Sequence, residues 1–397
     1  MASPAERNTD TVSRLLEDLF EIGVVYQQKD SLVISLQSRY EKERSIKLVS
    51  DRLRLAGYSF SFHEANGQLL IRINPTPRFR IPTINLVLFA LTLVTVYLVP
   101  VFYKSQAVVL QRLAEADPAI LEALQSGWQQ IKISIAAMPE IMRATLSALG
   151  QGVGIEFTLA LMSILLVHEM GHFLASRRRN IVTSWPYFIP APNIIGTFGA
   201  IIKSKSPFWN RRDLIEVGAA GPIAGWIVAI GWLWYGLSQS AAVPADSFPV
   251  GELMFSLDGE SILMKLSTLS LLGPVKDGFV YHLTEAAFAG WVGMLVTAIN
   301  LLPIGQLDGG HILYGLGRRR QHLFGFVALG ALLLLGMQSP IWWFFAIFGI
   351  VFGVKHPPTI YDHKKPGSIA TGLGIVALII LIISFTPIPF RFPGAGQ

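Results

Sequence analysis

The sequence predicts a polytopic α-helical membrane protein with about seven spans, a short membrane-associated strand layer and a small N-terminal α/β cytoplasmic domain. Of its 397 residues, 52% are hydrophobic and only 15% are charged, whereas soluble domains carry about 25% charged residues. Apolar runs of roughly 20 residues, long enough to cross a bilayer as helices, recur along the chain. Lys and Arg cluster at the ends of these runs, which is typical of cytoplasmic loops.

The charge balance and the absence of cysteine narrow the possible functions. A net charge of +6 can indicate a nucleic-acid partner. Here the basic residues flank apolar runs, so we expect them to orient the chain in a lipid bilayer and expect no nucleic-acid partner. With no cysteine, disulfides, thiolate metal sites and cysteine nucleophiles are excluded. Any metal must be held by His, Asp, Glu or backbone oxygen.

Residues 1–77 are predicted to form the cytoplasmic accessory domain. The first residues lack the apolar core of a signal peptide, so we expect the N-terminus in the cytoplasm. Asn66-Gly67 between two short apolar segments is a strong hairpin signal. The predicted elements are helices over 11–25 and 41–56, a strand over 31–36, and a hairpin of strands over 58–62 and 68–73.

Residues 78–150 are predicted to hold the first span and a helical segment on the outer face. The apolar run over 84–102 follows two arginines and is long enough to span. Residues 104–150 keep helical periodicity but carry scattered charges, so we expect them to lie on the membrane surface or against the bundle.

Residues 151–315 are predicted to be the core, and 316–397 to add C-terminal spans. Residues 181–212 are too short and too rich in Gly and Pro to span, so we expect strands or loops there, with 238–284 as an outer loop. An odd span count would leave residues 390–397 outside. The remaining predicted spans cover 154–176, 217–237, 286–308, 323–337, 341–354 and 368–386.

The motif His168-Glu169-x-x-His172 lies inside one of the apolar runs. On a helix the two imidazoles share a face, one turn apart, and can hold one metal ion beside the glutamate. The alternative is a helix with buried, hydrogen-bonded histidines. Polar side chains in a lipid-embedded helix are costly and usually functional, which favours a metal site.

A catalytic zinc site needs a third protein ligand and one position open to water. Asp308 is the best donor by depth. At 1.5 Å per helical residue, His168 lies about 14 Å before Arg177 and Asp308 about 15 Å before Arg318, so both reach similar depth from one side. His311 is an alternative ligand, or a residue that orients the ligands, although Gly309-Gly310 is expected to turn the chain before it. A second Leu-Asp-Gly triplet, at Asp258, lies in the outer loop and is interpreted as a turn.

The chemistry of one zinc ion per chain follows from these residues. Zinc lowers the pKa of bound water from 15.7 to about 7. Glu169 can take the proton from water and deliver it to the departing amine. Asn300, expected two helical turns before Asp308, could stabilise the developing oxyanion or orient substrate; its alternative role is an interhelical hydrogen bond.

The chain resembles the site-2 protease family of intramembrane zinc metalloproteases. The resemblance rests on the His168 motif, on Ala220-Gly-Pro-Ile-Ala-Gly225, and on Asn300-x-x-Pro303-x-x-x-x-Asp308-Gly-Gly-His311. It implies that His168, His172 and Asp308 bind Zn²⁺ and that Glu169 is the general base.

The resemblance also implies how a substrate is bound and where the protein resides. A membrane-protein substrate would pair as an unwound transmembrane segment with an edge strand, by main-chain recognition. The chain looks like the branch with plant chloroplast members and their bacterial relatives, which favours a bacterial cytoplasmic membrane. The substrate-binding residues would be Gly196, Thr197, Phe198, Gly199, Ala200, Ile201 and Pro303.

Two other functions compete with proteolysis. A metal transporter could use the same ligands as a transit site, but we find no second ligand cluster toward the outer side. A catalytically inactive, chaperone-like relative would not need the intact ligand set together with Glu169. The leading hypothesis is therefore a protease that cuts a transmembrane segment of a membrane protein near the cytoplasmic side.

Overall fold

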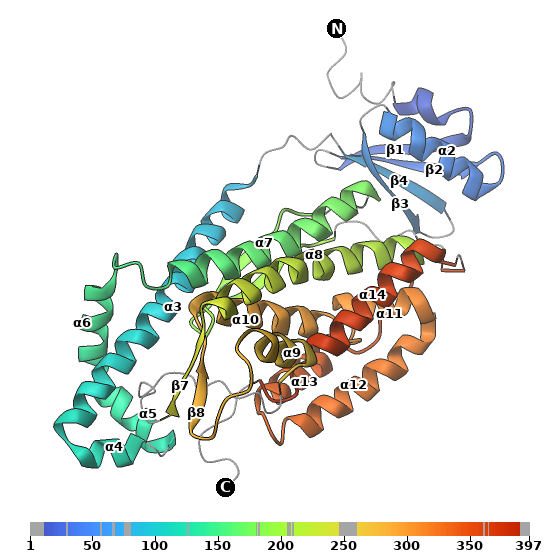
Figure 1. Cartoon of the computed structure of the whole chain (residues 1–397). Coiled ribbons are helices and arrows are strands. Elements are labelled where there is room, and N and C mark those ends of the chain that lie inside the picture. The colour runs from blue at the N-terminus through green and yellow to red at the C-terminus, as the bar shows by residue number, and fades with distance from the viewer. Residues whose placement is uncertain are drawn as a thin grey trace. The chain divides into compact units, whose positions relative to one another are not determined.

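The computed structural model divides into two compact units (Figure 1). Unit 1 comprises residues 1–82, 176–185 and 203–207, and unit 2 comprises the rest. The structure describes residues 12–389 apart from 29–30, 56–57, 66–67, 75–80, 125–126, 180, 182, 205–207, 209, 246–259, 360–361 and 364. The hairpin residues Asn66-Gly67, the Asp258 turn and the C-terminal residues 390–397 therefore lie outside the described part.

Unit 1 is built on a four-stranded antiparallel sheet of order β1-β2-β4-β3. The predicted strand and the predicted hairpin pairing are confirmed, as is the helix predicted over 41–56. The helix predicted over 11–25 is wrong beyond residue 16, because Phe20 onward pairs with β2 and buries Phe20 completely. The elements are β1 (Phe20–Gln28), β2 (Ser31–Ser38), α2 (Lys42–Leu55), β3 (Ser59–Ala65) and β4 (Gln68–Asn74).

In the described part of unit 2, three helices are long and apolar enough to cross a membrane: α3 (Thr83–Ala116), α7 (Ile155–Arg178) and α8 (Arg211–Ser238). The other predicted spans are helical but shorter. At 1.5 Å per residue the 15 residues of α12 extend about 22 Å, less than the 30 Å of a bilayer core. The shorter apolar helices are α9 (Ile262–Leu271), α10 (Glu285–Asn300), α12 (Gln321–Leu335), α13 (Ile341–Phe352) and α14 (Ser368–Ser384).

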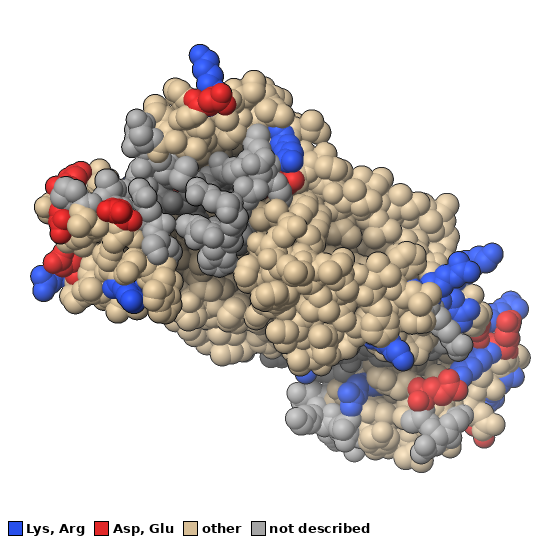
Figure 2. Space-filling model, turned by 90° about the horizontal axis from the view of Figure 1, so that it is seen from below, with Lys and Arg blue, Asp and Glu red and all other residues tan. Residues whose placement is uncertain are grey.

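The outer surface of these helices is apolar. Val327, Val351 and Ile369, on three different helices, are each 70% or more exposed. Figure 2 shows a broad expanse without Lys, Arg, Asp or Glu across the helices of unit 2. An exposed face of this kind is suited to lipid rather than to water.

Residues 104–150 are helical as predicted, whereas the segment 238–284, predicted to be a loop, contains regular structure in its described residues. Residues 104–150 continue α3 and then form α4 to α6, and residues 238–284 include a strand pair and α9, whose first turn is capped by Ser261. The further elements are α4 (Pro118–Leu124), α5 (Gly127–Ala136), α6 (Met138–Ala148), β5 (Tyr187–Pro190), β6 (Thr197–Ile201), β7 (Ala241–Pro244), β8 (Phe279–His282), α11 (Asp308–Gly317) and η2 (Arg318–Arg320).

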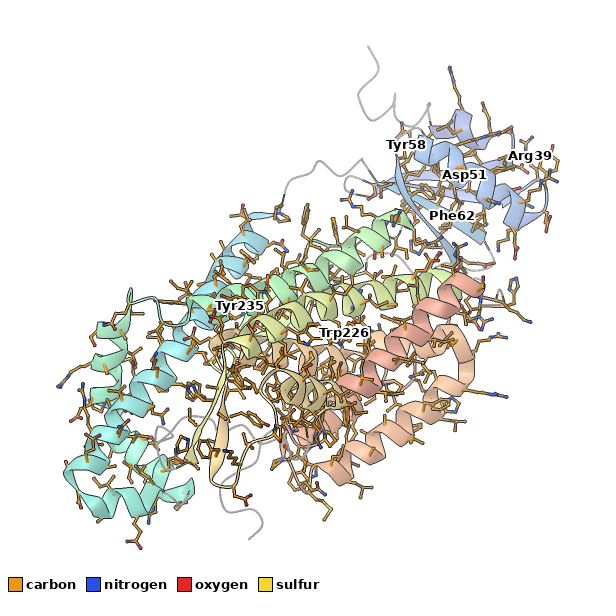
Figure 3. The ribbon with its side chains drawn as sticks, in the orientation of Figure 1. Arg39, Asp51, Tyr58, Phe62, Trp226 and Tyr235 are labelled. Carbon is orange, nitrogen blue, oxygen red and sulfur yellow. The ribbon has the colours of Figure 1, made fainter. Side chains whose placement is uncertain are left out.

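The core of unit 2 lies where α7, α8 and α10 pack together. Leu161, Leu233 and Trp291, one from each helix, are almost completely buried. Trp226 of α8 is labelled in Figure 3. It donates its indole N–H to Ser384 Oγ of α14 at 2.9 Å, and this bond joins α14 to the bundle. The three helices thus give a rigid base for the polar residues described next.

The span predicted over 286–308 is two helices rather than one. Helix α10 ends at Asn300, seven loop residues follow, and α11 begins at Asp308. The loop contains Pro303, and the N–H of Gly305 donates to the carbonyl of Val354 at 3.0 Å instead of continuing the helix. Asp308 therefore begins a helix rather than ending one.

Candidate metal centre

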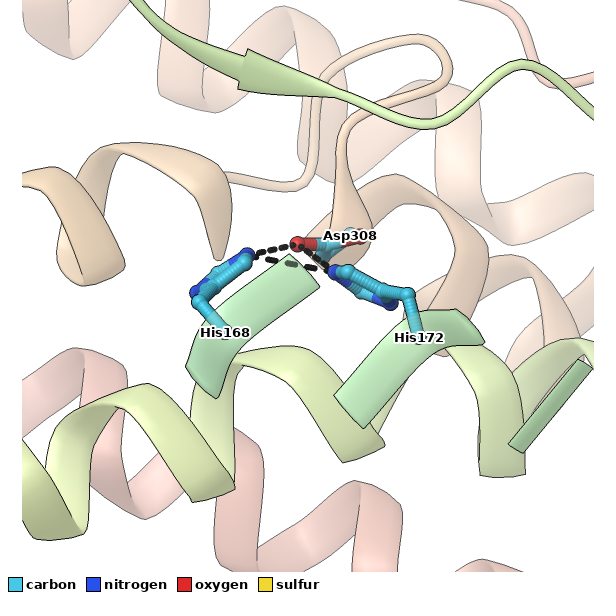
Figure 4. Close-up of side chains that lie close together, drawn as sticks. All are labelled: His168, His172 and Asp308. Carbon is cyan, nitrogen blue, oxygen red and sulfur yellow. Dashed lines mark hydrogen bonds and ion pairs between the residues drawn. The ribbon is translucent and has the colours of Figure 1, made fainter. Parts of the chain in front are cut away.

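Three side chains far apart in the sequence converge inside unit 2. Helix α7 places His168 and His172 one turn apart, and the first residue of α11 supplies Asp308 (Figure 4). The two Nε2 atoms are 3.2 Å apart, and Asp308 Oδ2 lies 3.2 Å from His172 Nε2 and 3.5 Å from His168 Nε2. The side chains are only 5%, 11% and 15% exposed for His168, His172 and Asp308.

A hydrogen bond to α8 fixes the orientation of the His172 ring. Its Nδ1–H donates to the carbonyl of Val217 in α8 at 2.8 Å. In the neutral imidazole this bond makes Nε2 the unprotonated nitrogen, and Nε2 lies next to the other two donors. A ligating histidine commonly donates its second N–H in this way, which sets the tautomer and the ring plane.

Close packing of α7 on α8 makes room for both rings. A Cβ built on Gly221 would lie 2.1 Å from His172 Nε2, and one built on Gly225 would lie 2.9 Å from His168 Cβ. Any larger residue at Gly221 would occupy the position of the ring. The two glycines of the Ala220–Gly225 motif are thus required by the histidine rings.

The donor triangle fits a tetrahedral zinc ion. Donors 2.0–2.2 Å from such an ion lie about 3.3–3.6 Å apart, close to the three observed separations of 3.2, 3.2 and 3.5 Å. Two imidazoles and one carboxylate are also a ligand set that zinc uses in catalytic sites, with the fourth position left for water or substrate. Among the described residues, these three are the one group of three or more His, Asp or Glu side chains close enough to share an ion.

The predicted general base is adjacent to the ligands. Glu169 follows His168 in α7 and is 6% exposed. Burial of a charged carboxylate costs free energy unless a partner is present. Glu169 makes no hydrogen bond to another described side chain, so its carboxyl group remains available to the site. The role of Glu169 as the base remains a prediction.

Asn300 and Pro303 precede Asp308 in the chain, but the helix that was predicted to connect Asn300 with Asp308 is interrupted by a loop. Asn300 is the last residue of α10, so the two helical turns expected between it and Asp308 do not exist. Pro303 lies in the intervening loop, and its carbonyl accepts from Gln321 Nε2 at 3.0 Å. Roles of Asn300 in catalysis and of Pro303 in substrate binding stay predictions.

His311 faces a histidine that sequence reasoning missed. The expected turn at Gly309-Gly310 is wrong, because both glycines are in α11 and His311 lies in the same helix. His311 Nδ1 is 2.6 Å from His356 Nε2, and this contact holds the segment after α13 against α11.

Gln321 is the second missed residue. It is 2% exposed, and its Nε2 also donates to the carbonyl of Val354 at 2.9 Å, while its Oε1 accepts from the N–H of His356 at 3.2 Å. Together with the bond to Pro303, these contacts clamp the loop before Asp308 to residues 354–356. A lone Gln and a lone His after the Asn300–His311 motif gave no signal in one sequence.

The predicted strand layer is present as the β5–β6 hairpin. Asn85 Nδ2 and Thr95 Oγ1 of α3 donate to the carbonyls of Pro186 and Gly196, both at 2.7 Å, so the hairpin is held against α3. In β6, Phe198 is 66% exposed. Pairing with a substrate remains a prediction.

This fold and site define a class of protein: a helical protein with candidate membrane spans and, among its described residues, a His₂Asp group that could hold a metal ion. Residues 156–336 match Peptidase family M50, the site-2 protease family. No solved structure matches.

The similar curated proteins share the domain but are longer. The chain is 32% identical over 234 residues to "Probable zinc metalloprotease EGY1, chloroplastic" of Arabidopsis thaliana, covering 57% of this chain and 42% of that protein. It is 30% identical over 252 residues to "Probable zinc metalloprotease EGY2, chloroplastic" of Oryza sativa subsp. indica, covering 60% and 44%. It is 32% identical over 245 residues to the EGY2 protein of Arabidopsis thaliana, covering 61% and 43%. The matched region thus spans less than half the length of these relatives.

Proposed function

We propose that this chain is an intramembrane zinc metalloprotease that hydrolyses peptide bonds within or near transmembrane segments of membrane proteins. The observation that carries the proposal is the convergence of His168, His172 and Asp308 on one point, with Glu169 buried beside them. The Peptidase family M50 match and the zinc metalloprotease names of its relatives support it.

The proposed mechanism assigns one task to each residue. His168, His172 and Asp308 hold zinc, and the Val217 carbonyl fixes the His172 ring. Bound zinc supplies a Lewis acid that polarises the scissile carbonyl and acidifies water. Glu169 accepts the proton of the attacking water and then protonates the departing amine nitrogen.

Asn300 and the loop after it complete the assignment. The Asn300 amide would donate to the carbonyl oxygen of the substrate as negative charge develops on it. Pro303, two residues before Gly305 in the same loop, would contact the substrate chain. The clamp by Gln321 keeps this loop in one position relative to Asp308.

The substrate would add to the free edge of β6 as an unwound transmembrane segment. Residues Gly196 to Ile201 include the strand, which pairs with β5 on its other edge and exposes Phe198 and Ile201. Strand addition uses main-chain hydrogen bonds and tolerates varied side chains. A helical segment must unwind before zinc-dependent hydrolysis can reach its backbone.

The proposed setting is a bacterial cytoplasmic membrane with the N-terminus in the cytoplasm and about seven spans. Residues 1–77, 78–150, 151–315 and 316–397 remain our division of the chain into accessory, entry, core and C-terminal parts. The segment from Asp308 to Gly317 is helical, as the depth calculation assumed. Asp308 therefore lies about 15 Å from Arg318 along the helix axis. The site would open toward the cytoplasmic side.

Replacement of Glu169 tests the proposal. In proteoliposomes with a single-span reporter substrate, Glu169→Gln should keep one zinc per chain but lose cleavage by a factor of at least about 100. The matched control is Glu156→Gln, in the first turn of the same helix. Cleavage by Glu169→Gln at the wild-type rate would exclude Glu169 as the base. Reporter turnover by wild-type protein stripped of zinc would exclude the metalloprotease assignment.

A further inference from the structure

A groove between α3 and α6 lies outside the metal centre. It encloses about 610 Å³ and is lined by residues of α3, α6 and the segment after α6. This volume is within the range of small-molecule sites, about 300–1,000 Å³. We propose that the groove binds the phosphate headgroup of an anionic phospholipid, in the leaflet opposite the Thr83 end of α3.

The two helices that form the groove run antiparallel. At one end the N–H of Gly150, just after α6, donates to the hydroxyl of Tyr97 in α3 at 3.3 Å. Toward the other end Val109 packs in a buried cluster with Ile141.

Each of the two helices contributes a cation to the groove. Lys104 of α3 and Arg143 of α6 both line it. Neither has an ion-pair partner among the described residues. Two cations that line one groove repel each other, an anion bound between them removes this repulsion, and Lys and Arg are side chains that bind phosphate.

The rest of the lining is consistent with this assignment. Arg112, two turns beyond Lys104 in α3, and Glu140, one turn before Arg143 in α6, also line the groove. Glu140 can offset only one of the three cations, so the lining keeps an excess of positive charge. Val101 and Val108 line it with apolar surface, which suits the first carbons of acyl chains.

Depth in the membrane separates a lipid from a soluble anion. Lys104 lies 21 residues beyond the start of α3, which corresponds to about 31 Å along a helix, and the hydrocarbon core is about 30 Å thick. Lys104 is therefore at the boundary where lipid phosphates lie. Figure 2 shows charged side chains gathered at the end formed by α4 to α6, beside the uncharged expanse.

Native mass spectrometry of the full chain in neutral detergent tests the proposal. Phosphatidylglycerol and phosphatidylcholine are titrated separately, and bound lipid is counted. Wild type should retain phosphatidylglycerol preferentially, and Lys104→Gln with Arg143→Gln should weaken that binding at least about tenfold. The control pair Lys132→Gln with Lys276→Gln removes the same charge from exposed positions outside the groove and should bind as wild type does.

Three results would overturn the proposal. They are equal retention of both lipids by the wild type, undiminished phosphatidylglycerol binding by the Lys104 and Arg143 double variant, and a loss of binding in the control pair as large as that in the double variant. Displacement of phosphatidylglycerol by equimolar inorganic phosphate would also overturn it, since the site would then take a free anion. If the double variant does not fold, the wild-type protein decides. Raising salt tenfold must weaken its binding of phosphatidylglycerol and leave phosphatidylcholine unchanged, and any other outcome contradicts the proposal.

Discussion

Replacing Gly221 by Ala should dismantle the metal centre without touching a ligand. The added Cβ would stand 2.1 Å from His172 Nε2 and 2.4 Å from Cδ2, whereas ordinary contacts begin near 3.4 Å. The ring must therefore withdraw by about 1.3 Å, or α8 must shift away from α7 by as much. Ligand distances in a metal site tolerate about 0.2 Å, so His172 can no longer coordinate.

Zinc content and affinity of the purified variant measure the effect. Disturbing a residue that only supports a ligand costs about 10–100-fold in metal affinity, and displacing the ligand itself should cost at least about 100-fold. Gly231→Ala is the matched control, because it lies on the same helix and its Cβ would have no heavy atom within 4 Å. Wild-type zinc affinity in Gly221→Ala would refute the packing argument.

Two further predictions concern the surroundings of the site. Gln321→Leu removes the partner of the Pro303 carbonyl and of the His356 N–H, whereas the Val354 carbonyl keeps its bond from Gly305, and it should lower the free energy of unfolding by about 2–3 kcal/mol. Thermal unfolding beside the exposed control Gln338→Leu checks this, and equal midpoints would contradict it. Burial raises the pKa of Glu260, in the segment before α9, to about 7. The hydrogen bond that Glu260 accepts from the Trp291 N–H lowers this pKa, but burial has the larger effect. As pH rises from about 4.5 to 7 the unfolded chain loses this proton and the folded chain keeps it, so stability falls. Glu260→Gln should thus be more stable than wild type by up to about 3 kcal/mol at pH 8 and equal to it at pH 4, and no gain at pH 8 would contradict the assignment.

Long-range convergence of the ligands was predictable because lipid restricts where polar residues can lie. His168 and His172 follow from helical spacing, and Asp308 followed from its matching distance to the next basic cluster. The same reasoning misjudged the path between Asn300 and Asp308. Pro303 and Gly305 were visible as helix breakers, but the bond from Gly305 to Val354 that ends the helix depends on a segment far along the chain.

Elements that depend on a distant partner were predicted least well. The apolar pattern around Phe20 is compatible with a helix and with a strand, and pairing with β2 stabilises the strand. His356 and Gln321 bear no motif and matter only through what they contact after folding. By contrast, the hairpin pairing of β3 with β4 is local, and the sequence contained all of its determinants.

The zinc dissociation constant of Asp308→Ala beside the wild type tests the central claim most directly. A site built from His168, His172 and Asp308 should bind one zinc per chain, and removal of the carboxylate should weaken binding at least about 100-fold. Asp308→Asn, which keeps one oxygen donor without the charge, should fall between them. Zinc binding by Asp308→Ala with wild-type affinity would contradict a shared ion at these three side chains.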